Sequence, residues 1–353
     1  MKKNNLYIIY LLMAFVQIAC AENLEMNQDL EIQKESVLTR FEQFEEYAKL
    51  HSEGLNKIFL ISKEENMSFS KLDVETDHFI LETVTNMVKC DSQFARIIVN
   101  DNQRKDCLNH LESIVKERPC IQVKKTQSRS DAMPTDNPDS EEPITVSDYA
   151  CSLEEQIATS ELVTNAQRQE LSEIYTVEVG AKEIMEAEIQ KIITSSLFLS
   201  LSEKEHNDLL ISAAVYIDSA NYWMEHLDEW MSGVDGAVVA TRGWSDLWGK
   251  VKQVARIDAD GAFWGAIGGA ITGAIGGAGA GTMAGGVGAV PGAAVGAYYG
   301  GIGGALSGAI IESARGATLV RSNDMTASTE NSTTDAASST EATETTSATP
   351  YVD

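Results

Sequence analysis

The chain has 353 residues, a length that allows two or three domains. Its 53 Asp and Glu residues outnumber its 27 Lys and Arg residues, and the formal net charge is −26. This charge excludes a general nucleic-acid-binding protein, because neutralising phosphates needs a surplus of Lys and Arg. Twenty of the 26 glycines lie between Gly261 and Gly316, so a Gly/Ala-rich segment follows an acidic one.

Residues 1–21 are typical of a secretory signal peptide. A basic start precedes an apolar run from Leu6 to Ala19, which is shorter than the roughly 20 residues of a membrane span. An Ala-x-Ala pattern allows cleavage after Ala21, but the four residues ending at Cys20 also resemble a loose bacterial lipobox, in which Cys20 is lipidated. Both outcomes predict an exported protein, either secreted or in the cell envelope (outer membrane or periplasm).

The four cysteines besides Cys20 are an even number, which suits two disulfides in an exported chain. Three connectivities remain open, and pairing of nearest neighbours favours Cys90–Cys107 and Cys120–Cys151. Three of these thiols together with His110 also have the composition of a zinc site. Disulfides are the favoured interpretation in an exported chain, so we expect no metal site and no cofactor.

Residues 22–123 form the first predicted helical region. Leu38, Phe41, Phe44 and Tyr47 recur at spacings of three among charged residues, so one helix face is apolar. Residues 124–148 are rich in Pro, Ser, Thr, Asp and Glu, which predicts a linker or long loop.

A second helical region is predicted over residues 149–257. Three pairs have the spacing of a helix-starting capping box: Ser152–Glu155, Thr164–Gln167 and Ser202–Glu205. The last predicted helix of the region carries two apolar stripes and ends at Gly233. One stripe contains Tyr216, Trp223 and Trp230; it indicates either packing in the core of a helical bundle or a docking face for a partner protein.

Residues 258–316 contain a run of 51 residues, 261–311, without a charged side chain. Glycines recur every fourth residue in this run, a spacing typical of helices that contact one another closely in membranes. The predicted helix-packing glycines are Gly261, Gly265, Gly269, Gly273, Gly277, Gly281, Gly288, Gly292, Gly296, Gly300, Gly304 and Gly308.

Two helices are expected in this segment, about 261–284 and 291–314, with Pro291 opening the second one. Each is roughly 36 Å long at 1.5 Å per residue, enough for a bilayer core of roughly 30 Å. We expect Asp260 to cap the first helix and Arg315 to lie at the end of the second. Nine glycines disfavour the first helix by roughly 9 kcal/mol relative to Ala, so it needs lipid or tight packing to form.

Residues 317–353 are rich in Ser, Thr, Ala and Glu and lack a large apolar cluster. Such a segment buries too little surface to offset the entropy of ordering, so a disordered tail is predicted. The expected fold is therefore all-α: a helical bundle region, then a glycine-zipper helical hairpin and a disordered C-terminal tail.

The stretch from Tyr222 to Trp230 and the segment 258–311 resemble a group of uncharacterised exported proteins of Bacteroidota. The runs Asp258–Ala262 and Gly288–Ala294 carry this resemblance, which covers about residues 216–316. The glycine segment also resembles the glycine-zipper hairpins of pore-forming bacteriocins. Neither resemblance supplies a catalytic residue.

The chain contains no metalloprotease, nucleophile-elbow or P-loop motif, so no enzymatic activity is predicted. The first functional hypothesis is membrane association through the hairpin, as an anchor or a bacteriocin-like protein, with membrane lipid or other copies of the chain as the partner. The alternative is a soluble binding or assembly module in which the hairpin is packed internally.

Overall fold

The computed structural model describes the backbone of residues 2–67, 69–91, 94, 101, 104–105, 107–109, 111, 145–232, 244–283 and 289–338. Side chains are described from residue 28 onward, except for residues 244–247, 281, 283 and 324–338. Most of these residues are in helices and none of them is in a strand, so the predicted all-α class is confirmed. The Cys20 side chain, His110, Cys120, Gly288 and most of the predicted linker lie outside the described residues.

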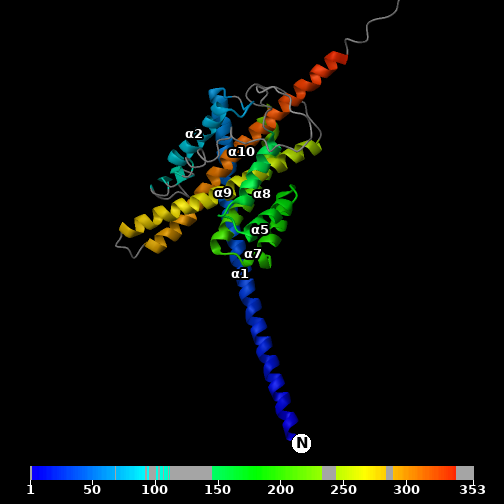
Figure 1. Ribbon diagram of the computed structural model, residues 1–353, viewed down its shortest axis with the longest axis vertical. Helices are drawn as coiled ribbons and strands as arrows, with labels where there is room; N and C mark the ends of the chain where they lie inside the picture. Colours follow the sequence, from blue (N-terminus) through cyan, green and yellow to red (C-terminus); the bar gives the residue numbers. More distant parts are fainter. Residues whose placement is uncertain are drawn as a thin grey trace, which may run out of the picture.

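The described helices are α1 (Lys2–Glu65), α2 (Val74–Cys90), α4 (Val146–Thr159), α5 (Asn165–Thr176), α6 (Lys182–Ile193), α7 (Ser196–Leu199), α8 (Glu203–Ser232), α9 (Trp244–Met283) and α10 (Ala289–Ser338). Figure 1 shows α9 and α10 as an antiparallel pair that crosses the bundle obliquely. One end of this pair extends beyond the other helices, and α1 extends beyond the bundle in a different direction.

Helix α8 lies at the centre of the bundle, in contact with α1, α5, α6, α9 and α10. It is buried on more than one face, as expected for a helix with apolar side chains around much of its circumference. Tyr216 and Trp223 are fully buried, and the Trp230 ring stacks on the Phe59 and Phe69 rings, at centroid distances of 5.1 and 5.2 Å. The docking-face interpretation of this stripe is therefore wrong, and its core-packing interpretation is confirmed.

The helix-start predictions are confirmed at two of the three capping boxes. Thr164 and Gln167 cap each other reciprocally at the start of α5, and Ser202 and Glu205 do the same before α8. The Ser152–Glu155 prediction is wrong, because α4 starts earlier, at a capping box formed by Thr145 and Asp148. Helix α8 ends at Ser232, next to the predicted terminator Gly233.

The predicted boundaries of the glycine segment are corrected at both ends. Helix α9 begins at Trp244, so Asp260 lies inside it and caps no helix start. Helix α10 continues to Ser338, and residues 317–321 are buried, so the tail predicted from residue 317 begins too early. Arg315 is likewise inside α10 and fully buried. The residues that flank the charge-free run are therefore part of the core, where distant helices supply their partners.

The predicted Cys90–Cys107 disulfide is not formed. Cys90 is exposed at the end of α2, whereas Cys107 is buried with its Sγ 3.8 Å from Ser307 Oγ of α10. Cys151 is exposed on α4 and carries a free thiol, and its predicted partner Cys120 lies outside the described residues. The folded bundle thus separates two cysteines that proximity in sequence suggested as a pair.

Candidate functional site: a glycine-faced hairpin rooted in buried charge

The hairpin of α9 and α10 is held together by glycines that face each other in a constant antiparallel register. At nine of the ten facing glycines, all except Gly292, an added Cβ atom would overlap the backbone of the opposite glycine. The facing pairs are Gly261–Gly308, Gly265–Gly304, Gly269–Gly300, Gly273–Gly296 and Gly277–Gly292. Gly281 lies in the last turns of α9, and its surroundings are not described. Both four-residue glycine rows are therefore used inside a single hairpin.

We expect Gly265→Ala to lower the free energy of unfolding by about 1–3 kcal/mol. Its new Cβ would lie 2.6 Å from the carbonyl carbon of Gly304, and backbone atoms cannot rotate away as a side chain can. Gly316→Ala is the matched control, because Gly316 is also buried in the hairpin but its Cβ would meet Val254 and Ile257 at 3.5 Å, an ordinary contact. The control should be neutral or up to about 1 kcal/mol stabilising, through helix propensity. Urea denaturation of both variants measures the difference; equal effects would contradict the backbone-contact argument.

The hairpin has two parts with different surroundings. The base, residues 261–270 and 300–314, is enclosed by the bundle: Phe263, Ile267 and Leu306 are almost fully buried. The tip, residues 271–283 and 289–299, extends beyond the bundle (Figure 1). The tip carries no charged side chain and exposes four large apolar ones: Ile271 by 40%, Ile275 by 70%, Val290 by 81% and Val295 by 53%.

A buried carboxylate in α9, Asp258, connects the base of the hairpin to the bundle. Its Oδ2 atom accepts hydrogen bonds from Ser219 Oγ, from Trp223 Nε1 at 3.0 Å and from Ser313 Oγ at 2.6 Å. His51 Nε2 of α1 lies 3.5 Å from the same oxygen, an ion-pair distance. One carboxylate oxygen thus joins α1, α8, α9 and α10, and Asp258 has no exposed surface.

His51 is a fully buried side chain between two carboxylates. Its Nδ1 atom lies 3.1 Å from Asp218 Oδ2, which also accepts a hydrogen bond from Ser52 Oγ at 2.6 Å. Burial alone lowers the pKa of His51, but hydrogen bonds and charge from Asp218 and Asp258 outweigh burial and raise that pKa to about 9. At neutral pH His51 is therefore a buried cation that compensates Asp258.

A second buried cluster lies farther along the base. The Arg315 guanidinium donates from Nε to Asp77 Oδ1 of α2 at 2.7 Å and from Nη1 to Glu312 Oε1 at 3.2 Å. Glu312 also accepts a hydrogen bond from the Tyr149 hydroxyl of α4. On α9, buried Asp260 accepts a hydrogen bond from the Tyr175 hydroxyl of α5. Every charged residue that borders the charge-free run is thus held by a partner from another part of the bundle.

Sequence reasoning identified the hairpin glycines but missed these buried clusters. In the sequence, these clusters appear only as charges at the ends of an apolar run: Asp258, Asp260, Glu312 and Arg315. Charged side chains at such positions are usually exposed to solvent. The available signal was the periodic pattern of α8, in which Ser212, Ser219 and Trp223 bring polar atoms to a buried face. Among the described residues, no group of His, Cys, Asp and Glu could hold a metal ion.

Comparison with protein-family models, with curated proteins and with solved structures finds no match for this chain. Among the described residues, one helical segment, Ala289–Asn323, is long and apolar enough to cross a membrane, with a mean hydropathy of 1.3. Of its apolar window, 72% is buried inside the protein. This segment therefore cannot be surrounded by lipid along its whole length while the bundle stays folded.

Proposed function

We propose that the protein is an exported cell-envelope protein that associates with a membrane through the tip of a glycine-zipper hairpin. The observation that carries this proposal is the exposed, charge-free tip with its four apolar side chains. Large apolar side chains are also exposed singly elsewhere, for example Leu60 and Ile184, but scattered residues of this kind are normal on soluble surfaces. The tip differs because no charged residue accompanies them over two adjacent helices.

The length of the tip favours an anchor in one leaflet over a transmembrane pore. Residues 271–283 extend roughly 20 Å at 1.5 Å per residue, less than the roughly 30 Å hydrocarbon core of a bilayer. A full span requires the base to leave the bundle, which breaks the Asp258 and Arg315 clusters. Those buried charges therefore limit how deeply the folded protein can insert into a membrane.

The packing inside the hairpin also argues against assembly through the glycine rows. These glycines already contact one another across α9 and α10, so the rows are not available to a second copy. What the tip offers outward is a set of isoleucine, valine and alanine side chains, which suit lipid chains. In lipid, the helical backbone of both arms keeps its hydrogen bonds satisfied internally.

Aromatic side chains lie where the tip joins the base. Tyr298 and Tyr299 of α10 are partly buried against the core, with ring centroids 5.2 Å apart. Tyr and Trp prefer the headgroup level of a membrane, where one part of the ring is apolar and another can hydrogen-bond. The position of these rings supports an orientation in which the root of the tip lies at the headgroup level of the membrane.

Membrane binding by this tip should be weak and reversible. The four exposed apolar side chains contribute about −2 kcal/mol at roughly −0.5 kcal/mol each. A net charge of −26 repels the chain from anionic lipid surfaces. Zwitterionic vesicles are therefore the appropriate test membrane, and the proposed lipidation at Cys20 would add a second attachment.

We expect the double variant Ile275→Ser/Val290→Ser to reduce co-flotation with zwitterionic vesicles at least about fivefold, because removing about 1 kcal/mol of apolar transfer energy changes a partition constant by that factor. Both side chains are exposed, so the bundle should keep its stability. The measurement uses the mature chain, residues 22–353, so that the leader does not bind the vesicles itself.

The matched control is Ile184→Ser/Val74→Ser, which removes the same two side-chain types from α6 and from the start of α2. These residues are 60% and 67% exposed. Flotation of this control should equal that of the unchanged protein. Equal flotation of both double variants, or no flotation of the unchanged chain, would rule out the tip as the attachment.

A second candidate function is a soluble assembly module, and the internal packing of the hairpin base favours it. The former docking candidates Tyr216, Trp223 and Trp230 are buried, so the tip is the surface that such a module would present. Limited proteolysis separates the two functions: vesicles should protect the tip of a membrane-bound protein and should leave cleavage of a soluble module unchanged.

A further inference from the structure

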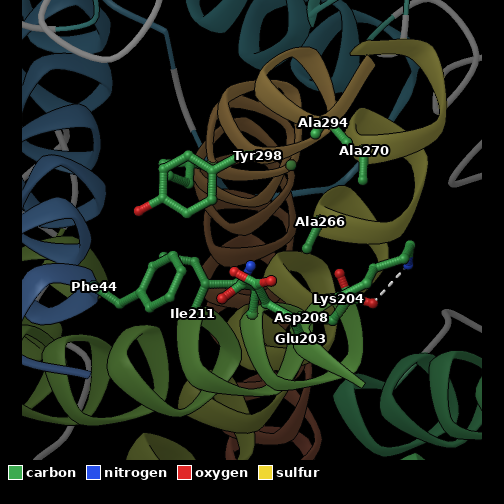
Figure 2. A pocket seen from close by; sticks show the side chains of 13 residues that line it. Phe44, Glu203, Lys204, Asp208, Ile211, Ala266, Ala270, Ala294 and Tyr298 are labelled. Carbon is green, nitrogen blue, oxygen red and sulfur yellow. Dashed lines mark hydrogen bonds and ion pairs between the residues drawn. The ribbon is translucent and has the colours of Figure 1, made fainter. Parts of the chain in front are cut away.

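A pocket of about 240 Å³ lies at the root of the hairpin tip, between α1, α8 and the hairpin. Figure 2 shows Phe44 and Tyr298 on one side of it and alanines of the hairpin on the other, with Ile211 between them. The Phe44 and Tyr298 rings have centroids 6.3 Å apart. The interior of the pocket is therefore mainly apolar, and its floor is the body of α8.

Small side chains on the hairpin create this space. One wall is lined by small residues of the hairpin, whereas α10 also contributes Tyr298 on the side of Phe44; the small residues are Ala266, Ala270, Ala294, Ala297 and Gly301. Two of these residues are tightly packed, since Ala270 is 6% and Ala266 is 2% exposed. Ala294, by contrast, is exposed on the tip and borders the opening. These small apolar side chains leave a surface against which an acyl chain can pack.

Charged and polar groups from the start of α8 lie together along one side of the pocket, which we call its mouth (Figure 2). Asp208 is nearly buried, and its carboxylate is compensated by Lys204 Nζ at 2.8 Å and by Gln167 Nε2 at 3.3 Å. Glu203 is exposed, so water and salt screen its charge. The acidic groups at the mouth therefore exert little repulsion on an incoming anion.

Arg40 of α1 is not one of the lining residues but lies beside the pocket, in contact with the lining residue Asn207, and its hydrogen bonding is incomplete. Its Nη1 atom lies 3.4 Å from Asn207 Oδ1, a residue that lines the pocket, and its Nη2 atom lies 3.4 Å from His206 Nδ1. Both contacts are long for hydrogen bonds, and Arg40 Nε is buried without a hydrogen-bond partner among the described residues. A guanidinium in this state favours a carboxylate, which it can bind through two parallel hydrogen bonds.

We propose that this pocket binds a free fatty acid, with its acyl chain between Phe44, Tyr298 and the hairpin alanines and its carboxylate at Arg40. The apolar interior selects a single chain, and the guanidinium selects an anionic head. This assignment goes beyond membrane association and does not depend on it, because the ligand can be delivered from solution.

Calorimetric titration of the mature chain with decanoate tests this proposal, without vesicles and below the concentration at which decanoate forms micelles. We expect saturable binding at one site. Decyltrimethylammonium, which has the same chain and a cationic head, should bind at least tenfold more weakly. Arg40→Gln should weaken decanoate binding at least fivefold and leave decyltrimethylammonium binding unchanged.

A pair of tryptophan variants locates the site. Ala294→Trp places a large ring at the opening of the pocket from an exposed position, and should weaken decanoate binding at least tenfold. Ala280→Trp, also exposed on the tip but not part of the pocket, should change binding less than twofold. Circular dichroism checks that both variants keep the helical fold.

Three results overturn the proposal: no saturable decanoate binding, equal affinity of both tryptophan variants, or no effect of Arg40→Gln. If a tryptophan variant fails to fold, Arg40→Gln and the comparison of the two head groups still decide the outcome. A protein that binds decanoate but does not float with vesicles contradicts the proposed membrane function and leaves the pocket assignment intact; the reverse result contradicts only the pocket.

Discussion

Arg315→Met should lower the free energy of unfolding by about 3–5 kcal/mol. Arg315 has no exposed surface and pairs with Asp77 and Glu312, which are themselves largely removed from water. Removing the guanidinium leaves two carboxylates in the core without their cation. Urea denaturation followed by circular dichroism measures the loss.

Two further variants make the Arg315 result specific. Lys252→Met removes the cation of an exposed pair with Glu178 at 2.8 Å and should cost less than about 1 kcal/mol, because water screens that pair. The triple variant Arg315→Met/Asp77→Asn/Glu312→Gln should recover part of the loss, because neutral amides need no counter-charge. A loss for Arg315→Met no larger than that for Lys252→Met would show that the buried cluster does not hold the hairpin base.

Raising the pH from 6.5 to 9.5 should lower the stability of the protein by about 3 kcal/mol through His51. The folded-state pKa of His51, about 9, lies above its ordinary value of 6.5. A group with a raised folded-state pKa contributes its full stabilisation below pH 6.5, and this contribution is lost as the pH rises through 9. The groups that face the imidazole are the Asp218 and Asp258 carboxylates.

The variant His51→Gln isolates this effect, because glutamine can donate a hydrogen bond but does not titrate. Its unfolding free energy should fall by only roughly 1 kcal/mol between pH 6.5 and 9.5, against about 3 kcal/mol more for the unchanged protein, and should be lower at pH 6.5 than that of the unchanged protein. Burial raises the pKa of the Asp208 carboxyl to about 6, so Asp208 titrates mainly below this window. Burial raises the pKa of the Glu45 carboxyl to about 7, so Glu45 titrates partly inside the window and contributes a loss of roughly 1 kcal/mol to both proteins. An unchanged slope in His51→Gln would assign the pH dependence to other groups.

The two stability predictions bear on the depth of membrane insertion. Asp258 and Arg315 hold α9 and α10 to the bundle at the level where the charge-free run ends. Weakening either cluster should therefore ease release of the base, whereas the tip substitutions act on lipid contact alone. Comparing flotation of Arg315→Met with that of the tip variants separates these two contributions.

Local patterns in the sequence predicted much of the helical architecture. The glycine spacing predicted a close helical hairpin, and the Thr164–Gln167 and Ser202–Glu205 boxes marked two helix starts correctly. These predictions were correct because helix periodicity and capping depend on residues only a few positions apart in the sequence. The glycine rows are also self-complementary within one segment, so their pairing needs no distant partner.

Other predictions failed because they depended on distant residues. Asp260 and Arg315 looked like helix-end charges, but α5 and α2 supply Tyr175 and Asp77 as buried partners. The Trp223 stripe was ambiguous between core and docking surface until α1, α9 and α10 enclosed it.

The sequence by itself determined an acidic all-α protein with a charge-free, glycine-spaced hairpin, because composition and period are properties of neighbouring residues. Only the tertiary structure decided which part of that hairpin is exposed. The base is buried because α8 presents Ser219 and Trp223 to Asp258, whereas no described helix covers Ile275 and Val290 at the tip. Burial depends on which helices meet in space, and that depends on contacts between residues far apart in the chain.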